Sequence, residues 1–180
     1  MSASEPDRDK PEAEIVWSGR FIEAKRLGRW EFVSRTRGIS AAAILALDDG
    51  HVILVEQYRI PIASLCLELP AGLVGDGEEG EEAGEAAIRE LEEETGYRAD
   101  RVVDLGRFHA SPGMSSEGFT LLRAEGLSRV GEGGGVEGED IAVHRVRLEA
   151  VADFIAERRS AGVAIDVKLL LLLGAGMLAS

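Results

Sequence analysis

The hydrophobic and polar positions of this chain alternate with the period of β-strands in several segments. Between residues 15 and 34, apolar side chains are separated by charged and glycine positions, a pattern that predicts a short antiparallel β-meander. Apolar runs at 39–47 and 51–58 flank the sequence Asp48-Asp49-Gly50, which is typical of a hairpin turn. Further strands are predicted at 65–69, 102–108, 119–124 and 141–148.

Three other segments carry a helical pattern. The clearest is 83–95, where Gly96 is well placed to end the helix. Its apolar helical positions are Ala83, Ala86, Ala87, Ile88 and Leu91. Residues 148–159 and 167–178 predict the last two helices, which are broken around Gly162. Strands mixed with a few helices, without regular βαβ units, predict an α+β fold of the α/β/α sandwich type.

The composition fits one globular domain and narrows the range of partners. The 180 residues are 45% hydrophobic, which is enough to bury a sizeable core. With Lys+Arg 20 against Asp+Glu 33, the net charge of −13 argues against nucleic acid or an anionic membrane as the main partner. The single cysteine, Cys66, excludes an intramolecular disulfide and fits a reducing cytoplasm.

The two ends and one internal segment differ from the patterned regions. Residues 1–14 are polar and lack the apolar core of a signal peptide, so they predict a disordered lead-in. The apolar run 169–173 is too short to span a bilayer, and we expect a buried terminal helix there. Residues 131–140 are rich in glycine and acids, and we expect this segment to be mobile.

Candidate chemistry lies near the end of the helix predicted at 83–95. Glu90 is an i,i+4 neighbour of Glu94 and an i,i+3 neighbour of Glu93, so their carboxylates crowd one helical face. Like charges at this spacing cost roughly 0.2–0.5 kcal/mol per pair in water. A run of glutamates is usually solvated surface, and that interpretation suffices for the other acids of this helix. A divalent cation reverses the repulsion, and Mg²⁺ typically combines a few carboxylates with substrate phosphates.

The order of residues around these acids is more specific than their charge. The segment 75–97 resembles the Nudix box, G-x5-E-x7-R-E-U-x-E-E-x-G-U, where U is bulky and apolar or aromatic. The specified positions are filled by Gly75, Glu81, Arg89, Glu90, Leu91, Glu93, Glu94, Gly96 and Tyr97. The resemblance covers about residues 15–175. It implies a Nudix α/β/α sandwich around a mixed β-sheet, with a small N-terminal antiparallel β-element.

The residues just before the box narrow the resemblance to one branch. Residues 67–73 read Leu-Glu-Leu-Pro-Ala-Gly-Leu, which resembles the ELPAG signature of the ADP-ribose pyrophosphatase branch. In that branch the carbonyl of the alanine is a metal ligand together with glutamates of the box. The resemblance therefore implies a Mg²⁺ or Mn²⁺ site formed by Ala71, Glu90, Glu93 and Glu94.

Two loops, one before the predicted helix and one after it, also have counterparts in this branch. There, the glycine of PAG, here Gly72, is usually also the first glycine of the box, whereas counting back from Arg89 reaches Gly75. The loop before the helix is therefore longer in this chain, and both glycines stay open as the equivalent. Pro112 lies sixteen positions after Gly96 in a Ser-Pro-Gly sequence similar to that of the branch.

The resemblance also implies contacts with substrate. Arg59 ends an E-Q-Y-R sequence similar to a branch motif whose arginine contacts substrate phosphate, as the planar guanidinium favours. Arg35 aligns with another arginine that contacts phosphate or ribose. Phe21 and Trp30 stand where family members stack an adenine between aromatic rings, one from the partner subunit. Trp17 is the other candidate, and packing within the meander is the alternative for these aromatics.

Related enzymes place a glutamate in a mobile loop, where it orients or deprotonates the attacking water. Glu137 and Glu139 both meet that description, and the sequence does not choose between them. The catalytic roles that the resemblance implies therefore fall on Glu93, Arg89 and one of these two acids.

The implied function is metal-dependent hydrolysis of the diphosphate linkage of ADP-ribose to AMP and ribose 5-phosphate, in the cytoplasm. Residues 15–38 are expected to be a β-element that forms a homodimer, and residues 39–180 the Nudix hydrolase domain. One alternative is a hydrolase of other nucleoside-diphosphate sugars such as GDP-mannose. Another is a non-catalytic Nudix-like sensor of ADP-ribose, although a sensor need not keep carboxylates that repel one another.

Overall fold

The computed structural model describes residues 12–36, 39–74, 82–136 and 138–178. Contacts divide the chain into two units. The first contains the residues up to Gly38 together with Ser111–Glu117, and the second contains Ile39–Ala110 and Gly118–Ser180. Most of the predicted lead-in lies outside the described residues, and its last residue, Glu14, already belongs to a strand.

The described part of the first unit is a three-stranded antiparallel sheet in the order β1-β2-β3. Its strands are β1 (Glu14–Ser18), β2 (Ile22–Leu27) and β3 (Trp30–Arg35), which confirms the predicted meander. Gly28 has φ 59°, so a residue without a side chain suits the tight turn between β2 and β3. The segment 111–117 adds to β3, because Val33 donates its N–H to the Met114 carbonyl at 2.9 Å.

This small sheet leaves many large apolar side chains in solvent. Exposed apolar residues of the first unit include Ile15, Val16, Trp17, Phe21, Ile22 and Trp30. Trp17 and Trp30 are both 56% exposed. A concentration of apolar surface on a few short strands is unusual for a monomer and is typical of an interaction surface.

The second unit is built on a mixed sheet of eight strands among the described residues, with the central order β13-β6-β5-β4-β10-β9. In addition, β12 pairs with β5 and β7 pairs with β4. The strands are β4 (Ser40–Asp48), β5 (His51–Arg59), β6 (Ser64–Glu68), β7 (Ala71–Val74), β9 (Arg101–Phe108), β10 (Phe119–Glu125), β12 (Ala142–Arg147) and β13 (Ala164–Ile165). Because β10 is parallel to β4 and antiparallel to β9, the sheet is mixed, as predicted.

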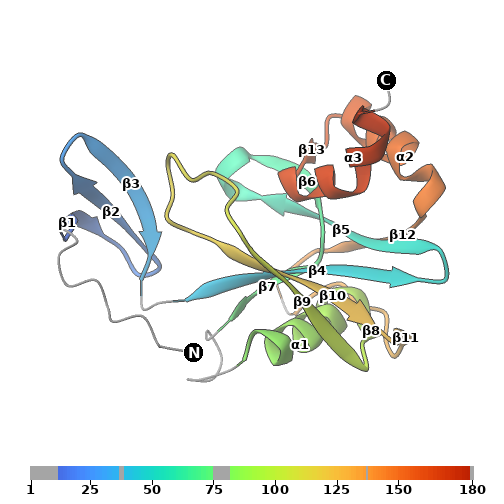
Figure 1. Ribbon diagram of the computed structural model, residues 1–180. Helices are drawn as coiled ribbons and strands as arrows, with labels where there is room; N and C mark the ends of the chain where they lie inside the picture. The colour runs from blue at the N-terminus through green and yellow to red at the C-terminus, as the bar shows by residue number, and fades with distance from the viewer. Residues whose placement is uncertain (1–11, 37–38, 75–81, 137, 179–180) are drawn as a thin grey trace. The chain divides into compact units, whose positions relative to one another are not determined.

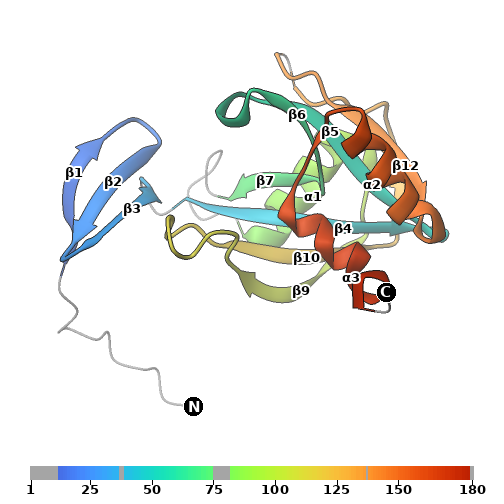
Figure 2. The same cartoon turned by 90° about the horizontal axis from the view of Figure 1, so that it is seen from above.

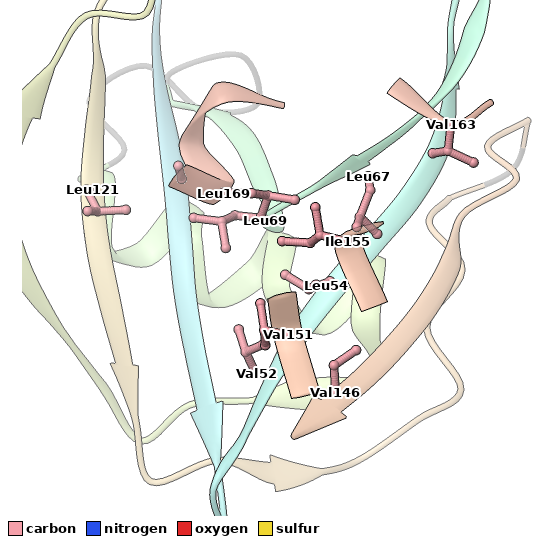
Figure 3. Packing of buried hydrophobic residues seen from close by; sticks show 11 residues of the cluster. Val52, Leu54, Leu67, Leu69, Leu121, Val146, Val151, Ile155, Val163 and Leu169 are labelled. Carbon is pink, nitrogen blue, oxygen red and sulfur yellow. The ribbon is translucent and has the colours of Figure 1, made fainter. Parts of the chain in front are cut away.

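Helices cover both faces of this sheet, as Figure 1 and Figure 2 show. They are α1 (Ala83–Thr95), α2 (Val151–Ser160) and α3 (Leu170–Leu178). Neighbouring residues of a strand point to opposite faces. Accordingly, Val52 and Leu54 pack in one cluster with Val151 and Ile155 of α2 and with Leu169, just before α3, which Figure 3 shows. Ile53 packs in the other cluster, with Leu91 of α1. The predicted α/β/α sandwich is therefore confirmed.

Several boundaries differ from the sequence predictions. The last helix begins with a 3-10 turn, Val167–Leu169, because the Asp166 side chain accepts a hydrogen bond from the Lys168 N–H at 2.8 Å. The terminal helix is only partly buried, since Leu170 and Leu171 are exposed. Short strands such as β7 and β13, and the ladder of β8 (Tyr97–Arg98) with β11 (Ser128–Arg129), were not predicted, because so few residues carry no detectable period. In the part of the chain that the structure describes, no helix has the length and apolar character needed to cross a membrane.

Candidate active site

Helix α1 has its orientation fixed by small and apolar side chains. Ala86, Ala87 and Leu91 are fully buried against the sheet. Gly96 ends the helix in the left-handed conformation, with φ 71°, and donates its N–H to the Glu92 carbonyl at 2.9 Å. The buried face extends to Glu94, which is only 6% exposed. The same face that builds the core therefore holds a carboxylate inside the protein.

Glu94 lies against the start of β7. The Ala71 backbone N–H donates to Glu94 Oε2 at 3.0 Å. Burial raises the pKa of Glu94 to about 8, and the nearby charges of Glu90 and Glu139 act in the same direction. The Ala71 N–H and the positive charge of Arg59 oppose this rise in pKa. The structure thus brings Ala71 and Glu94 together through the amide of Ala71, and the metal-ligand role of the Ala71 carbonyl stays a prediction.

Glu90 lies over Gly72, one residue further along β7. A β-carbon at Gly72 would fall 2.0 Å from Glu90 Cγ, so only glycine fits there while Glu90 keeps its position. Burial raises the pKa of Glu90, Arg89 opposes the rise, and Glu93 and Glu139 add to it. Of the two glycines left open by the sequence, Gly72 therefore contacts a box glutamate, and Gly75 lies outside the described residues.

Arg89 pairs with two neighbouring carboxylates of its own helix. Its Nη1 lies 3.1 Å from Glu90 Oε1 and donates to Glu93 Oε2 at the same distance. Glu93 is more open to solvent than Glu90, with 37% of its side chain exposed against 20%. The guanidinium thus partly neutralises the acidic face.

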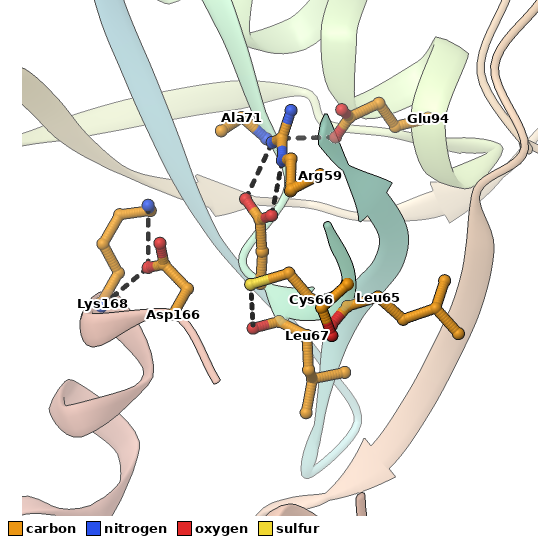
Figure 4. A network of polar contacts seen from close by, with 10 residues as sticks. Arg59, Leu65, Cys66, Leu67, Ala71, Glu94, Asp166 and Lys168 are labelled. Carbon is orange, nitrogen blue, oxygen red and sulfur yellow. Dashed lines mark hydrogen bonds and ion pairs between the residues drawn. The ribbon is translucent and has the colours of Figure 1, made fainter. Parts of the chain in front are cut away.

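Arg59 approaches the same cluster from the end of β5. Its Nε and Nη2 donate to the two carboxylate oxygens of Glu68 at 2.6 and 2.8 Å. This pairing raises the pKa of Arg59, and the negative charge of Glu94 adds to it. Figure 4 shows Arg59 beside Ala71 and Glu94. Glu68, which is 4% exposed, was not predicted as a site residue, although it is the glutamate of the ELPAG sequence.

The glycine-rich segment after β11 is hydrogen-bonded to the end of α1. The N–H groups of Gly134 and Gly135 donate to the carbonyls of Glu94 and Glu93 at 2.8 and 3.0 Å. The mobility predicted for 131–140 is therefore not supported for its first half. Glu139 lies close enough to act on the pKa values of Glu90 and Glu94. Glu137, the other candidate, lies outside the described residues.

The remaining predicted substrate contacts belong to the first unit. Arg35 forms an ion pair with Glu117. Phe21 is 51% exposed, and the Arg20 guanidinium lies 4.9 Å from its ring centre. Trp30 and Trp17 are equally exposed in β3 and β1. Packing within the meander does not bury these aromatic rings, and their contact with substrate stays a prediction.

The donor chemistry of the α1 cluster fits a hard divalent cation. Buried carboxylates whose pKa values are raised by burial and by one another are stabilised by a bound cation. Within the described ranges, however, no three His, Cys, Asp or Glu side chains already converge in a group that could hold a metal ion. Glu90 and Glu93 would have to exchange Arg89 for the cation, because both face this guanidinium.

Comparisons with known proteins agree with this geometry. Residues 36–160 match the NUDIX domain. The methanol dehydrogenase activator of Bacillus methanolicus is 36% identical over 154 residues, which cover 81% of this chain and 82% of that protein. The ADP-ribose pyrophosphatase of Bacillus subtilis (strain 168) is 39% identical over 120 residues, which cover 66% of this chain and 63% of that protein. The matches to the most similar relatives span from 56% to 82% of their own lengths.

A solved structure shares the fold. The crystal structure of an ADP compounds hydrolase superimposes with a TM-score of 0.66 and 24% sequence identity, covering 93% of this chain and 92% of that chain. At this identity the likeness shows the fold alone.

Proposed function

Since this chain belongs to the NUDIX domain family, as its sequence predicts, we propose that it is a pyrophosphohydrolase that cleaves the diphosphate linkage of ADP-ribose to AMP and ribose 5-phosphate. The observation that carries the proposal is the contact of the buried Glu94 carboxylate with the Ala71 N–H at the end of α1, where the charges of Glu90 and Glu139 are near enough to raise the pKa of Glu94. A buried acid whose pKa is raised by burial and by neighbouring carboxylates is typical of a functional site. The similarity to the Bacillus subtilis ADP-ribose pyrophosphatase supports the choice of substrate.

The carboxylates of Glu90, Glu93 and Glu94, with the Ala71 carbonyl, would hold Mg²⁺ or Mn²⁺. When bound, such ions neutralise a diphosphate and lower the pKa of water. Neutralisation is needed here, because a site rich in glutamates otherwise repels an anionic substrate.

The chain's own side chains supply the remaining roles. Arg59 keeps a guanidinium N–H free of its two bonds to Glu68, and it donates this group to a phosphoryl oxygen. Glu139 accepts a proton from the attacking water, and its closeness to Glu90 and Glu94 supports this role. Arg89 orients Glu90 and Glu93 from the outer side of the helix.

We propose that the first unit joins two copies of the chain into a homodimer. Its exposed apolar side chains, among them Trp17, Phe21 and Trp30, are the surface that a second copy would cover. In such a dimer Phe21 and Trp30 would stack the adenine, and Arg35 would contact phosphate or ribose. The cytoplasmic location stays a prediction.

A substrate panel tests the reaction. Purified protein with Mg²⁺ is given ADP-ribose, GDP-mannose, UDP-glucose, NADH or a diadenosine polyphosphate, and the products are separated by ion-exchange chromatography. We expect AMP and ribose 5-phosphate from ADP-ribose, and no turnover in EDTA. Faster turnover of another nucleoside-diphosphate sugar would move the assignment to that substrate. Tight binding of ADP-ribose without turnover would favour the sensor.

The roles of the acids are tested by isosteric variants. We expect Glu93→Gln and Glu94→Gln to lower kcat by at least about 100-fold, as removal of a group that stabilises developing charge does. Glu85→Gln is the matched control, because Glu85 is an exposed glutamate in the first turn of the same helix. Glu139→Gln and Glu137→Gln, measured separately, identify the acid that assists the water, and a large loss of kcat for Glu139→Gln is expected if Glu139 has this role.

A further inference from the structure

The segment that carries Glu139 is attached to α1 by main-chain hydrogen bonds. Gly134 N–H donates to the Glu94 carbonyl at 2.8 Å, and Gly135 N–H donates to the Glu93 carbonyl at 3.0 Å. Before them, Val130 N–H donates to the Gly96 carbonyl at 2.8 Å. The last carbonyls of a helix have no partner within the helix, so these bonds satisfy groups that otherwise need water. Residues 130–135 thus form a glycine clip on the end of α1.

The clip requires glycine for two distinct reasons. Gly133 has φ 71°, and a β-carbon there would fall 2.4 Å from the Thr95 carbonyl carbon, which is part of the backbone and has little room to move. Gly135 has φ 83°, and a β-carbon there would fall 2.5 Å from Glu139 Oε2, the end of a flexible side chain. An added methyl group at Gly133 would therefore displace the clip from the helix. At Gly135 it would displace the Glu139 carboxylate.

Glu139 is held over Gly135 by its own contacts. Its Oε2 accepts the Val136 N–H at 3.1 Å, and its N–H donates to the Val136 carbonyl at 3.0 Å. The chain therefore forms a closed connection from the helix carbonyls, through Gly135 and Val136, to the Glu139 carboxylate. The other end of this connection is the pair Glu93 and Glu94, whose own side chains belong to the acidic face.

We propose that Gly135 is a positioning residue, which fixes the Glu139 carboxylate relative to the acids of α1 by leaving open the space that this carboxylate fills. This inference rests on the proposed function only for its effect on turnover. The position itself is a property of the free protein. In this arrangement a single clip sets the distance between the proton acceptor and the carboxylates that share its site, with no need for the segment to close from solvent.

The test is Gly135→Ala, with Gly162→Ala as the matched control. Gly162 has φ 85°, close to that of Gly135, but a β-carbon there meets nothing within 4 Å. Both variants therefore carry the same backbone cost, and only one collides with Glu139. We expect Gly135→Ala to lower kcat for ADP-ribose by about 100-fold with KM changed less than about threefold, since a displacement of about 1 Å has that effect on kcat. Gly162→Ala should keep kcat within about threefold of wild type.

Two further measurements separate positioning from a general structural effect. In a Glu139→Gln background, Gly135→Ala should lower kcat no further, because residues that act through one another are not additive. In amide hydrogen exchange followed by NMR without substrate, Val136 should lose protection in Gly135→Ala, while Gly134 stays protected. An equal loss of kcat in both backgrounds, or kcat like that of the control, would overturn the proposal. If wild type turns over none of the substrates, the proposed function fails, and the exchange of Val136 alone decides whether Gly135 positions Glu139.

Discussion

Glu94→Gln should stabilise the metal-free protein, and more so as the pH rises. Burial raises the pKa of Glu94 from 4.5 to about 8, so the folded protein keeps the proton at pH values where the unfolded chain has lost it. Because the pKa is raised on folding, the contribution of Glu94 to the free energy of unfolding is complete below pH 4.5 and is lost as the pH rises through about 8. Glutamine still accepts the Ala71 N–H but carries no charge to bury.

The size of the effect follows from the same pKa difference. At about 1.4 kcal/mol per pH unit, the interval from 4.5 to about 8 gives an upper limit of about 5 kcal/mol. For one such group, the free energy of unfolding of wild type is lowered by about 1 kcal/mol at pH 5, by about 3 kcal/mol at pH 7 and by nearly the full limit at pH 9. The advantage of Glu94→Gln in the free energy of unfolding should grow by these amounts.

Urea unfolding in EDTA at pH 5, 7 and 9 measures this difference directly. Glu85→Gln, an exposed glutamate on the same helix, is the control and should show no comparable trend with pH. Saturating Mg²⁺ should raise the free energy of unfolding of wild type more than that of Glu94→Gln, because in wild type the bound cation takes the place of the proton on Glu94. A difference between Glu94→Gln and wild type that is constant from pH 5 to pH 9 would refute the reasoning.

Three further substitutions test the contacts of the second unit on both faces of its sheet. Arg158→Ala should lower the free energy of unfolding by about 3–5 kcal/mol, because Glu56 is 6% exposed and loses a guanidinium that donates to its two oxygens at 2.8 and 2.5 Å. The double variant with Glu56→Gln should recover much of this loss of stability, and a double variant no more stable than Arg158→Ala would contradict the pairing. Leu91→Ala should cost about 2–5 kcal/mol, seen as a lower Tm, since the side chain is fully buried. Gly72→Ala should lower kcat by about 100-fold through displacement of the neighbouring glutamate, with a Tm close to that of wild type; equal kcat would contradict the contact described.

The acidic end of α1 was predictable because helical geometry is local. The spacing of Glu90 and Glu94 places them on one face in any helix, and Gly96 marks the helix end without knowledge of the fold. The apolar runs around the Asp48-Asp49-Gly50 turn likewise predicted the central strands β4 and β5. These features depend on residues fewer than ten positions apart in the chain.

The contacts that complete the site were not predictable, because they join distant residues. The sequence shows that Glu68 follows an apolar run, but its bond to Arg59 depends on the pairing of β5 with β6. Glycines at 131–135 predicted mobility by composition, whereas their N–H groups satisfy the last carbonyls of α1. Composition indicates the backbone flexibility of a segment, whereas only the fold shows which hydrogen-bond acceptors lie close to its N–H groups.

Hydrolysis of ADP-ribose in water enriched in ¹⁸O tests the central claim most directly. The acids at the end of α1 are proposed to direct water at a phosphorus atom of the diphosphate. Mass spectrometry should therefore find one ¹⁸O atom in the phosphate group of AMP or of ribose 5-phosphate, with Mg²⁺ present and not in EDTA. Glu139→Gln should slow the appearance of that label without moving it to the other product. Absence of ¹⁸O from the phosphate groups of both products of wild type with Mg²⁺ would contradict the account.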